Sequence, residues 1–146
     1  MISFAFFSMA AAAASTPHCS PDAAELTGEQ TDYFLVEELV ENCKAALAIV
    51  VERARAEAER ERDFAIENSE NIPLSTLDID ELLVFDDAQT LWEKSMEADC
   101  VMLMAPYRHV NPPVLAHVDV GVCEAKRIKQ RIALLTARYS LTKDKK

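Results

Sequence analysis

Apolar side chains recur at three- and four-residue steps in three stretches of the chain, which is the spacing of one face of an α-helix. The first stretch predicts a helix from about Asp32 to Asn68, with apolar positions Leu35, Leu39, Cys43, Leu47 and Val50. The second predicts a helix from about Leu77 to Ala105, with apolar positions Leu82, Phe85, Ala88, Trp92, Met96, Cys100 and Leu103. The third predicts a helix from about Val120 to Leu141, with apolar positions Cys123, Ile128, Ile132, Leu135 and Tyr139. We therefore expect an all-α fold, a small bundle of about three helices with a long first helix.

Two segments interrupt this spacing, and one part of the first helix departs from it. The segment 71–76 contains a proline and supplies a helix cap at Ser75 or Thr76. The segment 107–118 contains two prolines, so we expect no regular helix there. From residue 52 to residue 63 the first helix is charged nearly all round, which predicts a solvated extension held by weak i,i+4 ion pairs. A coiled-coil surface is the alternative for this extension, but no apolar heptad supports it.

The length and charge of the chain limit its organisation and its partners. A chain of 146 residues is normally one domain, and at this size folding buries roughly two-thirds of the unfolded surface. The formal net charge of −10 argues against binding nucleic acid, which requires a basic surface. The same charge favours a cationic protein partner, because it would steer such a partner toward the chain.

The N-terminal residues 2–14 are apolar apart from two serines and end in a run of alanines. This pattern predicts a signal peptide over residues 1–14, cleaved near Ala13 or Ala14, followed by a single helical domain over 15–146. The segment contains no Lys or Arg, so a truncated start or a short apolar helix is the alternative. The segment is too short to span a bilayer, and no membrane span is expected after cleavage. We expect a periplasmic or secreted protein.

Four cysteines, an even number, lie in the predicted mature chain at Cys19, Cys43, Cys100 and Cys123. In an exported domain this favours two disulfides, although reduced cysteines in a cytoplasmic protein are the alternative. Three connectivities are possible. The pairs 19–43 and 100–123 are favoured because each closes a loop of about 25 residues, with a stabilisation on the order of 3 kcal/mol.

The sequence offers no arrangement typical of an active site. Nucleophilic catalysis would need a base beside a Ser or Cys, and the three histidines are scattered. The chain has no closely spaced His/Cys pairs for zinc, and its acidic stretch 78–87 lacks the glycine and final glutamate of a calcium-binding EF-hand loop. We expect no enzymatic activity, no catalytic residue, no metal and no cofactor.

A fixed spacing links the second and third predicted helices, namely Gln89-x2-Trp92-x7-Cys100 followed by Cys123-x7-Arg131-x3-Leu135. Trp92 and Leu135 fall in the apolar stripes and are expected to be packing anchors, with a ligand platform the alternative for Trp92. Arg131 is either a surface charge or a partly buried guanidinium that binds loop carbonyls or a carboxylate such as that of Asp99.

The segment 107–113 between the two helices is the best candidate for recognition. It offers an aromatic ring, a cation, an imidazole and an amide at Tyr107, Arg108, His109 and Asn111, on a backbone stiffened by two prolines. Preorganised loops lose little entropy on binding, as in many inhibitor loops. The alternative is an ordinary connection between helices.

The region 86–140 resembles the LprI-type lysozyme-inhibitor-like family of exported bacterial domains. The residues that carry the resemblance are Gln89, Trp92, Cys100, Tyr107, Cys123, Arg131 and Leu135. Met96 stands where the family usually has an arginine, and the family's Leu-Asn-x-x-Tyr-like signature does not follow Cys43. The resemblance implies a helical fold with the 100–123 disulfide and, by analogy, the inhibition of a lysozyme.

We therefore expect an exported binding protein that inhibits a basic, lysozyme-like cell-wall hydrolase by covering its cleft. The first rival interpretation is a structural or interaction domain of the cell envelope that uses the long charged helix. An enzyme with an unrecognised site is the weakest interpretation, because no base or metal cluster can be assembled from the sequence.

Overall fold

A computed structural model describes residue 19 and residues 33–68, 81–107 and 114–141 of the chain. These residues form three α-helices, α1 (Tyr33–Glu67), α2 (Glu81–Val101) and α3 (Val114–Arg138), and a short 3-10 helix, η3 (Met102–Tyr107). The described residues contain no strand, so the predicted all-α fold with a long first helix is confirmed. The predicted signal peptide over residues 1–14 lies outside the described residues.

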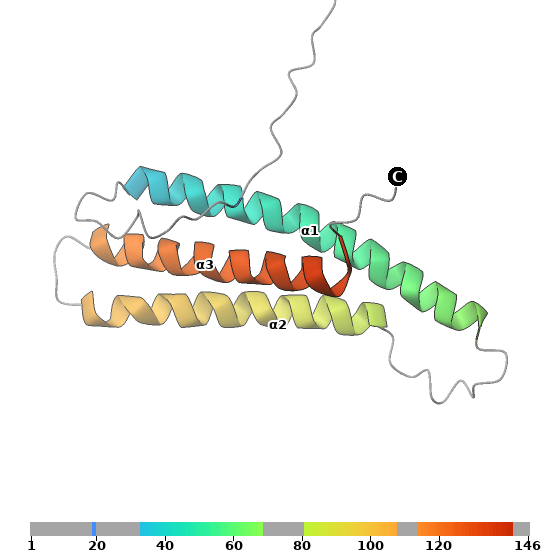
Figure 1. Cartoon of the computed structure of the whole chain (residues 1–146). Helices are drawn as coiled ribbons and strands as arrows, with labels where there is room; N and C mark the ends of the chain where they lie inside the picture. The colour runs from blue at the N-terminus through green and yellow to red at the C-terminus, as the bar shows by residue number, and fades with distance from the viewer. Residues whose placement is uncertain (1–18, 20–32, 69–80, 108–113, 142–146) are drawn as a thin grey trace, which may run out of the picture.

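The three helices lie roughly alongside one another; α3 is seen between α1 and α2 in the view of Figure 1, and α1 and α2 also contact each other directly, for example through Arg55 and Asp86. The chain runs in the same direction along α1 and α3 and in the opposite direction along α2. Since α1 has 35 residues and α3 has 25, α1 continues past the end of α3. No helix within the described ranges is long and apolar enough to cross a membrane.

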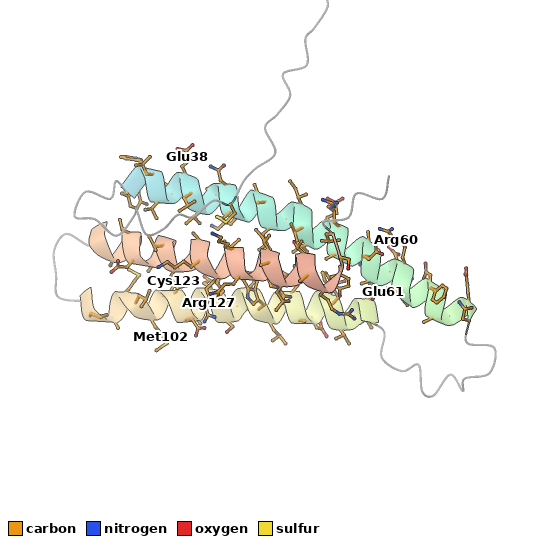
Figure 2. The ribbon with its side chains drawn as sticks, in the orientation of Figure 1. Glu38, Arg60, Glu61, Met102, Cys123 and Arg127 are labelled. Atoms are coloured by element: carbon orange, nitrogen blue, oxygen red, sulfur yellow. A yellow bond between two sulfur atoms is a disulfide. The ribbon has the colours of Figure 1, made fainter. Side chains whose placement is uncertain are left out.

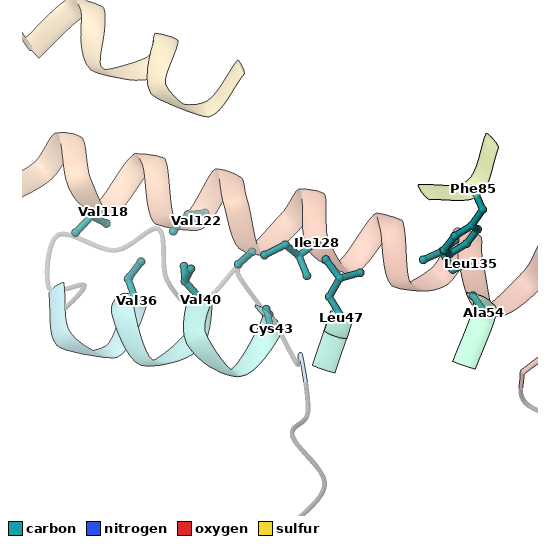
Figure 3. Close-up of a cluster of buried hydrophobic side chains, with 11 residues drawn as sticks. Val36, Val40, Cys43, Leu47, Ala54, Phe85, Val118, Val122, Ile128 and Leu135 are labelled. Carbon is teal, nitrogen blue, oxygen red and sulfur yellow. The ribbon is translucent and has the colours of Figure 1, made fainter. Parts of the chain in front are cut away.

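The core lies mainly between α1 and α3 (Figure 3). Side chains of α1 face those of α3 along a continuous apolar row that consists of Val36, Val40, Leu47, Val118, Val122 and Ile128. The row begins where Gly121 faces Val36, and a Cβ atom at position 121 would collide with the Val36 side chain. Glycine therefore lets α1 and α3 approach closely.

Both predicted disulfides are present. Cys19 is bonded to Cys43, with 4.3 Å between their Cα atoms, and this bond ties the segment before α1 to the buried face of that helix. Cys100 is bonded to Cys123, with 5.6 Å between Cα atoms, and this bond joins the end of α2 to α3. The favoured connectivity is thus confirmed, and it is compatible with an oxidising environment outside the cytoplasm.

Some residues predicted to be buried are exposed instead. Leu35 is 56% exposed, because the face of α1 toward α3 is set by Val36 and Val40. Ala88 on α2 and Leu103 in η3 are exposed, while Gln89, next to Ala88, is buried. The helical spacing was therefore right, but its phase was displaced by one residue at these positions.

The prediction of irregular structure up to residue 118 was wrong, because α3 begins at Val114. Its first residue directly follows two prolines in the sequence. Prolines are tolerated at the start of a helix, where the backbone N–H groups have no partner within the helix in any case. The prolines thus mark where the helix starts and do not prevent it.

The sequence predicted that the charged half of α1 is solvated nearly all round, and this prediction was wrong for one face of the helix. Ala54 and Ala58 are fully or almost fully buried, at 0% and 1% exposure. Arg53 donates a hydrogen bond from Nη2 to the carbonyl oxygen of Leu141 at 3.2 Å, so this part of α1 contacts the segment that follows α3. Alanines four residues apart therefore provide a narrow packing face inside a charged sequence.

Candidate functional site

Three residues of the spaced pattern, Gln89, Trp92 and Arg131, contact one another between α2 and α3. Arg131 donates from Nε to Oε1 of Gln89 at 3.0 Å. The amide nitrogen of Gln89 donates in turn to Oε1 of Glu93 at 3.0 Å. The Arg131 guanidinium carbon also lies 5.5 Å from the centre of the Trp92 ring, a cation–π arrangement. We call these four side chains the α2–α3 brace.

Burial of Arg131 in this brace has an electrostatic consequence. Partial burial lowers the pKa of the Arg131 guanidinium, while attraction by Tyr139 and Glu93 opposes that effect. Because an arginine starts from so high a pKa, it keeps its proton at physiological pH. The brace therefore holds a permanent positive charge against a planar aromatic ring and a buried amide.

The structure distinguishes the two interpretations of Arg131. The side chain is partly buried and its hydrogen-bond partner is Gln89, not Asp99. Asp99 instead forms an ion pair with Arg127, one helical turn earlier, which points toward α2 in Figure 2. The exchange follows from helix geometry, since Asp99 lies ten residues beyond Gln89 along α2 and therefore pairs with an earlier position of the antiparallel α3.

The sequence identified Gln89 only as part of the spaced pattern and did not predict that its side chain is buried. It is 7% exposed, and it is the buried polar residue among those the structure describes. A buried amide needs hydrogen-bond partners, and Arg131 and Glu93 supply them. The sequence signal that could have revealed it is a glutamine at a position of the stripe that otherwise holds Phe85 and Trp92.

Apolar contacts and a disulfide flank the brace. At one end, Leu135 is 2% exposed and Phe85 packs edge-on against the Tyr139 ring, with 5.8 Å between ring centroids. At the other end lies the Cys100–Cys123 disulfide, labelled at Cys123 in Figure 2. The α2–α3 pair is therefore fixed at three points along its length.

Of the four predicted recognition residues, the structure places one. Tyr107 is the last residue of η3. Arg108, His109 and Asn111 lie outside the described residues. The base of the predicted recognition segment is nonetheless defined, because η3 begins two residues after Cys100 and α3 begins at Val114.

Next to this base the surface is hollowed by a pocket of about 600 Å³. Leu103 and Pro106 of η3 form one wall, and α3 forms the other with Val122, Lys126 and Gln130 among its residues. The pocket combines apolar walls with polar and charged side chains at its edge.

A second groove, of about 570 Å³, lies between α1 and α2. Leu47, Val51, Trp92 and Met96 line its sides, with Ile128 of α3 also among its lining residues. Arg55 is also at the groove, and its Nε is 3.1 Å from a carboxylate oxygen of Asp86. That carboxylate raises the pKa of Arg55 through a hydrogen bond and its charge. Sequence reasoning missed this groove, because it depends on how far α1 and α2 stand apart.

The described residues form two surface hollows that are lined by apolar and charged side chains. Within the described ranges, no three His, Cys, Asp or Glu side chains are grouped so that they could hold a metal ion. The described cysteines are all bonded in disulfides. What the site can do is present a fixed, mixed apolar and charged surface to another molecule.

The chain was compared with known proteins at the levels of family, sequence and structure. No family model, no curated protein and no solved structure matches it. The resemblance of residues 86–140 to the LprI-type family therefore stays a prediction. The function has to be argued from the residues of this chain.

Proposed function

We propose that the protein is an exported binding protein that inhibits a basic, lysozyme-like cell-wall hydrolase. The observation that carries the proposal is the disulfide-fixed α2–α3 pair in a chain of strongly negative net charge. The chain has a net charge of −10, and the Cys100–Cys123 disulfide fixes the start of the connection between α2 and α3. A fixed connection loses less entropy when it binds than a free one would.

The proposed mechanism is occlusion of the enzyme's cleft. The acidic surface attracts a basic enzyme and raises the association rate, an effect that salt screens. Residues 107–113 then cover the cleft, with Tyr107 at the end of η3 as an aromatic anchor near the 600 Å³ pocket that Pro106 lines. Partner specificity comes from the few side chains that lose their water, and the long-range charge sets the rate.

The test is a lysozyme activity assay with the purified, oxidised chain. We expect inhibition that weakens as salt is raised, and we expect Tyr107→Ala to weaken it by about tenfold or more, as loss of a central aromatic contact does. The matched control is Tyr33→Ala, because Tyr33 is an exposed tyrosine at the start of α1, away from the segment 107–113. Equal inhibition by both variants would place the contact elsewhere.

A second candidate function is an interaction domain of the cell envelope that uses the end of α1. The observation in its favour is that α1 passes the end of α3 and carries Phe64, which is 68% exposed, in its last turns. Deleting the charged segment is a poor test, because Ala54 and Ala58 belong to the packed face. Phe64→Ser is cleaner. This candidate predicts that Phe64→Ser abolishes partner capture, and the inhibitor predicts no change in inhibition.

A further inference from the structure

The hollow of about 570 Å³ between α1 and α2, which we call the α1–α2 groove, is a surface that the proposed function does not use. Among the described residues, it has no lining residue in common with the 600 Å³ pocket beside η3. Its apolar lining consists of Leu47, Ala48, Val51, Trp92, Met96 and Ile128. Leu47 of α1 and Ile128 of α3 belong to the buried cluster of Figure 3, so the groove reaches down to the core.

The two helices that form the groove are joined at one end of it. Arg55 of α1 donates from Nε and Nη2 to the carboxylate of Asp86 on α2, at N–O distances of 3.1, 3.2 and 3.3 Å. The α1 side of the groove runs from Lys44 to Arg55, but the α2 side runs only from Trp92 to Met96. Four residues of helix are about 6 Å long, which is little more than one turn. The groove is therefore a short recess and not a channel along the bundle.

This size favours a small molecule over a protein helix as the occupant. One turn of an α-helix with its side chains is a cylinder about 10 Å wide and about 5.4 Å long, roughly 420 Å³ in volume. The groove of about 570 Å³ would hold little more than one such turn. A helix bound in a groove is instead anchored over two turns or more. Small-molecule sites have volumes of about 300 to 1,000 Å³, and the space between the helices of a bundle is a common place for them.

The side chains that α2 contributes to the groove favour an aromatic ligand. Trp92 and Met96 are one helical turn apart, and both are half-buried. An indole ring and a thioether both make favourable contacts with another aromatic ring, and the unbranched methionine adapts to the shape of a ligand. On the α1 side, Ala48 adds only a methyl group to the lining.

The charges around the groove favour a ligand without a charge. The lining has two cations and two anions, with a formal sum of 2 − 2 = 0, namely Lys44, Arg55, Glu52 and Glu93. Both cations already hold a carboxylate of the protein, since Lys44 is paired with Glu41 and Arg55 is paired with Asp86. An anionic ligand would compete with these carboxylates in a chain of net charge −10. A cationic ligand that stacked on Trp92 would meet Arg131, whose guanidinium carbon is 5.5 Å from the ring centre.

We propose that the α1–α2 groove is a binding site for a small, uncharged aromatic molecule. The ligand is recognised by the shape of the recess and by contact with Trp92 and Met96, and not by an ion pair. A bound ligand also stabilises the fold, because it binds the folded chain and not the unfolded one. The inference does not rest on the proposed function, since the lining of the groove includes no residue of the segment 107–113.

The test uses the full oxidised chain and two dyes with the same aromatic framework. N-phenylnaphthylamine is uncharged, and anilinonaphthalene sulfonate carries an added negative charge. Trp92 is the single tryptophan of the chain, so quenching of tryptophan fluorescence reports binding in the groove. We expect the uncharged dye to quench this fluorescence saturably at micromolar concentration. We expect the sulfonate to bind at least about tenfold more weakly, because burying an unpaired anion is unfavourable.

The variant that tests the site is Ala48→Glu, with Ala45→Glu as its matched control. Both alanines are exposed on α1, and of the two only Ala48 lines the groove. Ala48→Glu places a carboxylate in the recess and should weaken binding of the uncharged dye by about tenfold or more. Ala45→Glu should leave the affinity within about twofold of the original. Glutamate is a good helix former, so both variants should keep the helical circular dichroism of the parent chain.

Four results would overturn the inference. They are an absence of saturable quenching at micromolar uncharged dye, equal affinity for the two dyes, equal weakening by the two variants, and a dimer of the chain that Ala48→Glu dissociates in sedimentation. The last result would make a second copy of the chain the occupant. The lysozyme assay is separate. A chain that binds the dye but inhibits no lysozyme removes only the proposed function, and the reverse result removes only this inference.

Discussion

The two helix pairs that share α3 are held together in different ways. The α1–α3 pair is held by a long apolar row and a glycine, which bring two helices close over a large area. The α2–α3 pair is held by a few specific groups, the Cys100–Cys123 disulfide, the Arg127–Asp99 ion pair and the brace. The α1–α3 interface depends on the shapes of its apolar side chains. The α2–α3 interface depends on specific pairs of side chains, each of which needs its own partner. Substitutions in the two pairs should therefore fail in different ways.

The largest effect is expected from removing the disulfide of the α2–α3 pair. Cys100→Ser with Cys123→Ser should lower the free energy of unfolding by about 3 kcal/mol, because the unfolded chain loses a closed loop. Urea unfolding measures it. The control is Cys19→Ser with Cys43→Ser, whose separation of 24 residues is close to the 23 of the other pair. Both should lose similar stability, but only the 100–123 variant should lose inhibition. Full inhibition by that variant would contradict the role of the disulfide in holding the connection.

A smaller effect is expected from the brace. Arg131→Met should lower the free energy of unfolding by about 2 kcal/mol, because the buried Gln89 oxygen then has no donor. Replacing both partners, Arg131→Met with Gln89→Leu, should recover part of the loss, because no polar group is left buried and unpaired. Urea unfolding of the two single variants and the double variant gives the coupling. Strictly additive losses would show that the hydrogen bond does not join the helices energetically.

The α1–α3 pair should respond to an added methyl group. Gly121→Ala should cost about 1 kcal/mol net, because a clash with Val36 of roughly 2 kcal/mol is offset by the better helix propensity of alanine, worth about 1 kcal/mol. Val36→Ala in the same chain makes room for the methyl group, so the double variant should be less destabilised than the two single losses added together. Thermal unfolding followed by circular dichroism measures each variant. A gain in stability for Gly121→Ala alone would show that α1 can move away without loss.

The smallest effect is expected at the surface ion pair between α1 and α2. Arg55 and Asp86 have side chains that are 45% and 46% exposed, and exposed ion pairs contribute little. Arg55→Gln should leave the urea midpoint unchanged within error. A clear drop in the urea midpoint would mean that the Arg55–Asp86 ion pair at the 570 Å³ groove contributes to the stability of the fold.

The sequence predicted the α2–α3 pair better than the α1–α3 pair for a physical reason. Cysteine and tryptophan are rare residues, and the spacing of Trp92, Cys100, Cys123 and Arg131 limits which positions of α2 and α3 can contact each other. The three helices could also be predicted, because the period of an α-helix is fixed and the apolar positions follow it. Arg131 was placed in the correct helix, but its partner depends on the relative slide of α2 and α3, which periodicity does not determine.

The α1–α3 interface could not be read in the same way. Gly121, Ala54 and Ala58 have small side chains that give no hydrophobic signal, and they matter only because another helix lies against them. The alanines lie in a sequence that is charged nearly all round, so composition predicted solvent where the structure has packing. Ala88 of α2 was assigned to the packed face and is exposed, because periodicity does not fix which neighbouring position faces the bundle.

The central claim is that the protein works by binding a cationic partner. The most direct measurement is the rate of a basic lysozyme as oxidised chain is added, at low and at moderate salt. The account predicts saturable inhibition at micromolar chain or below, weaker at the higher salt. An unchanged rate with lysozymes of every class at micromolar chain would contradict it.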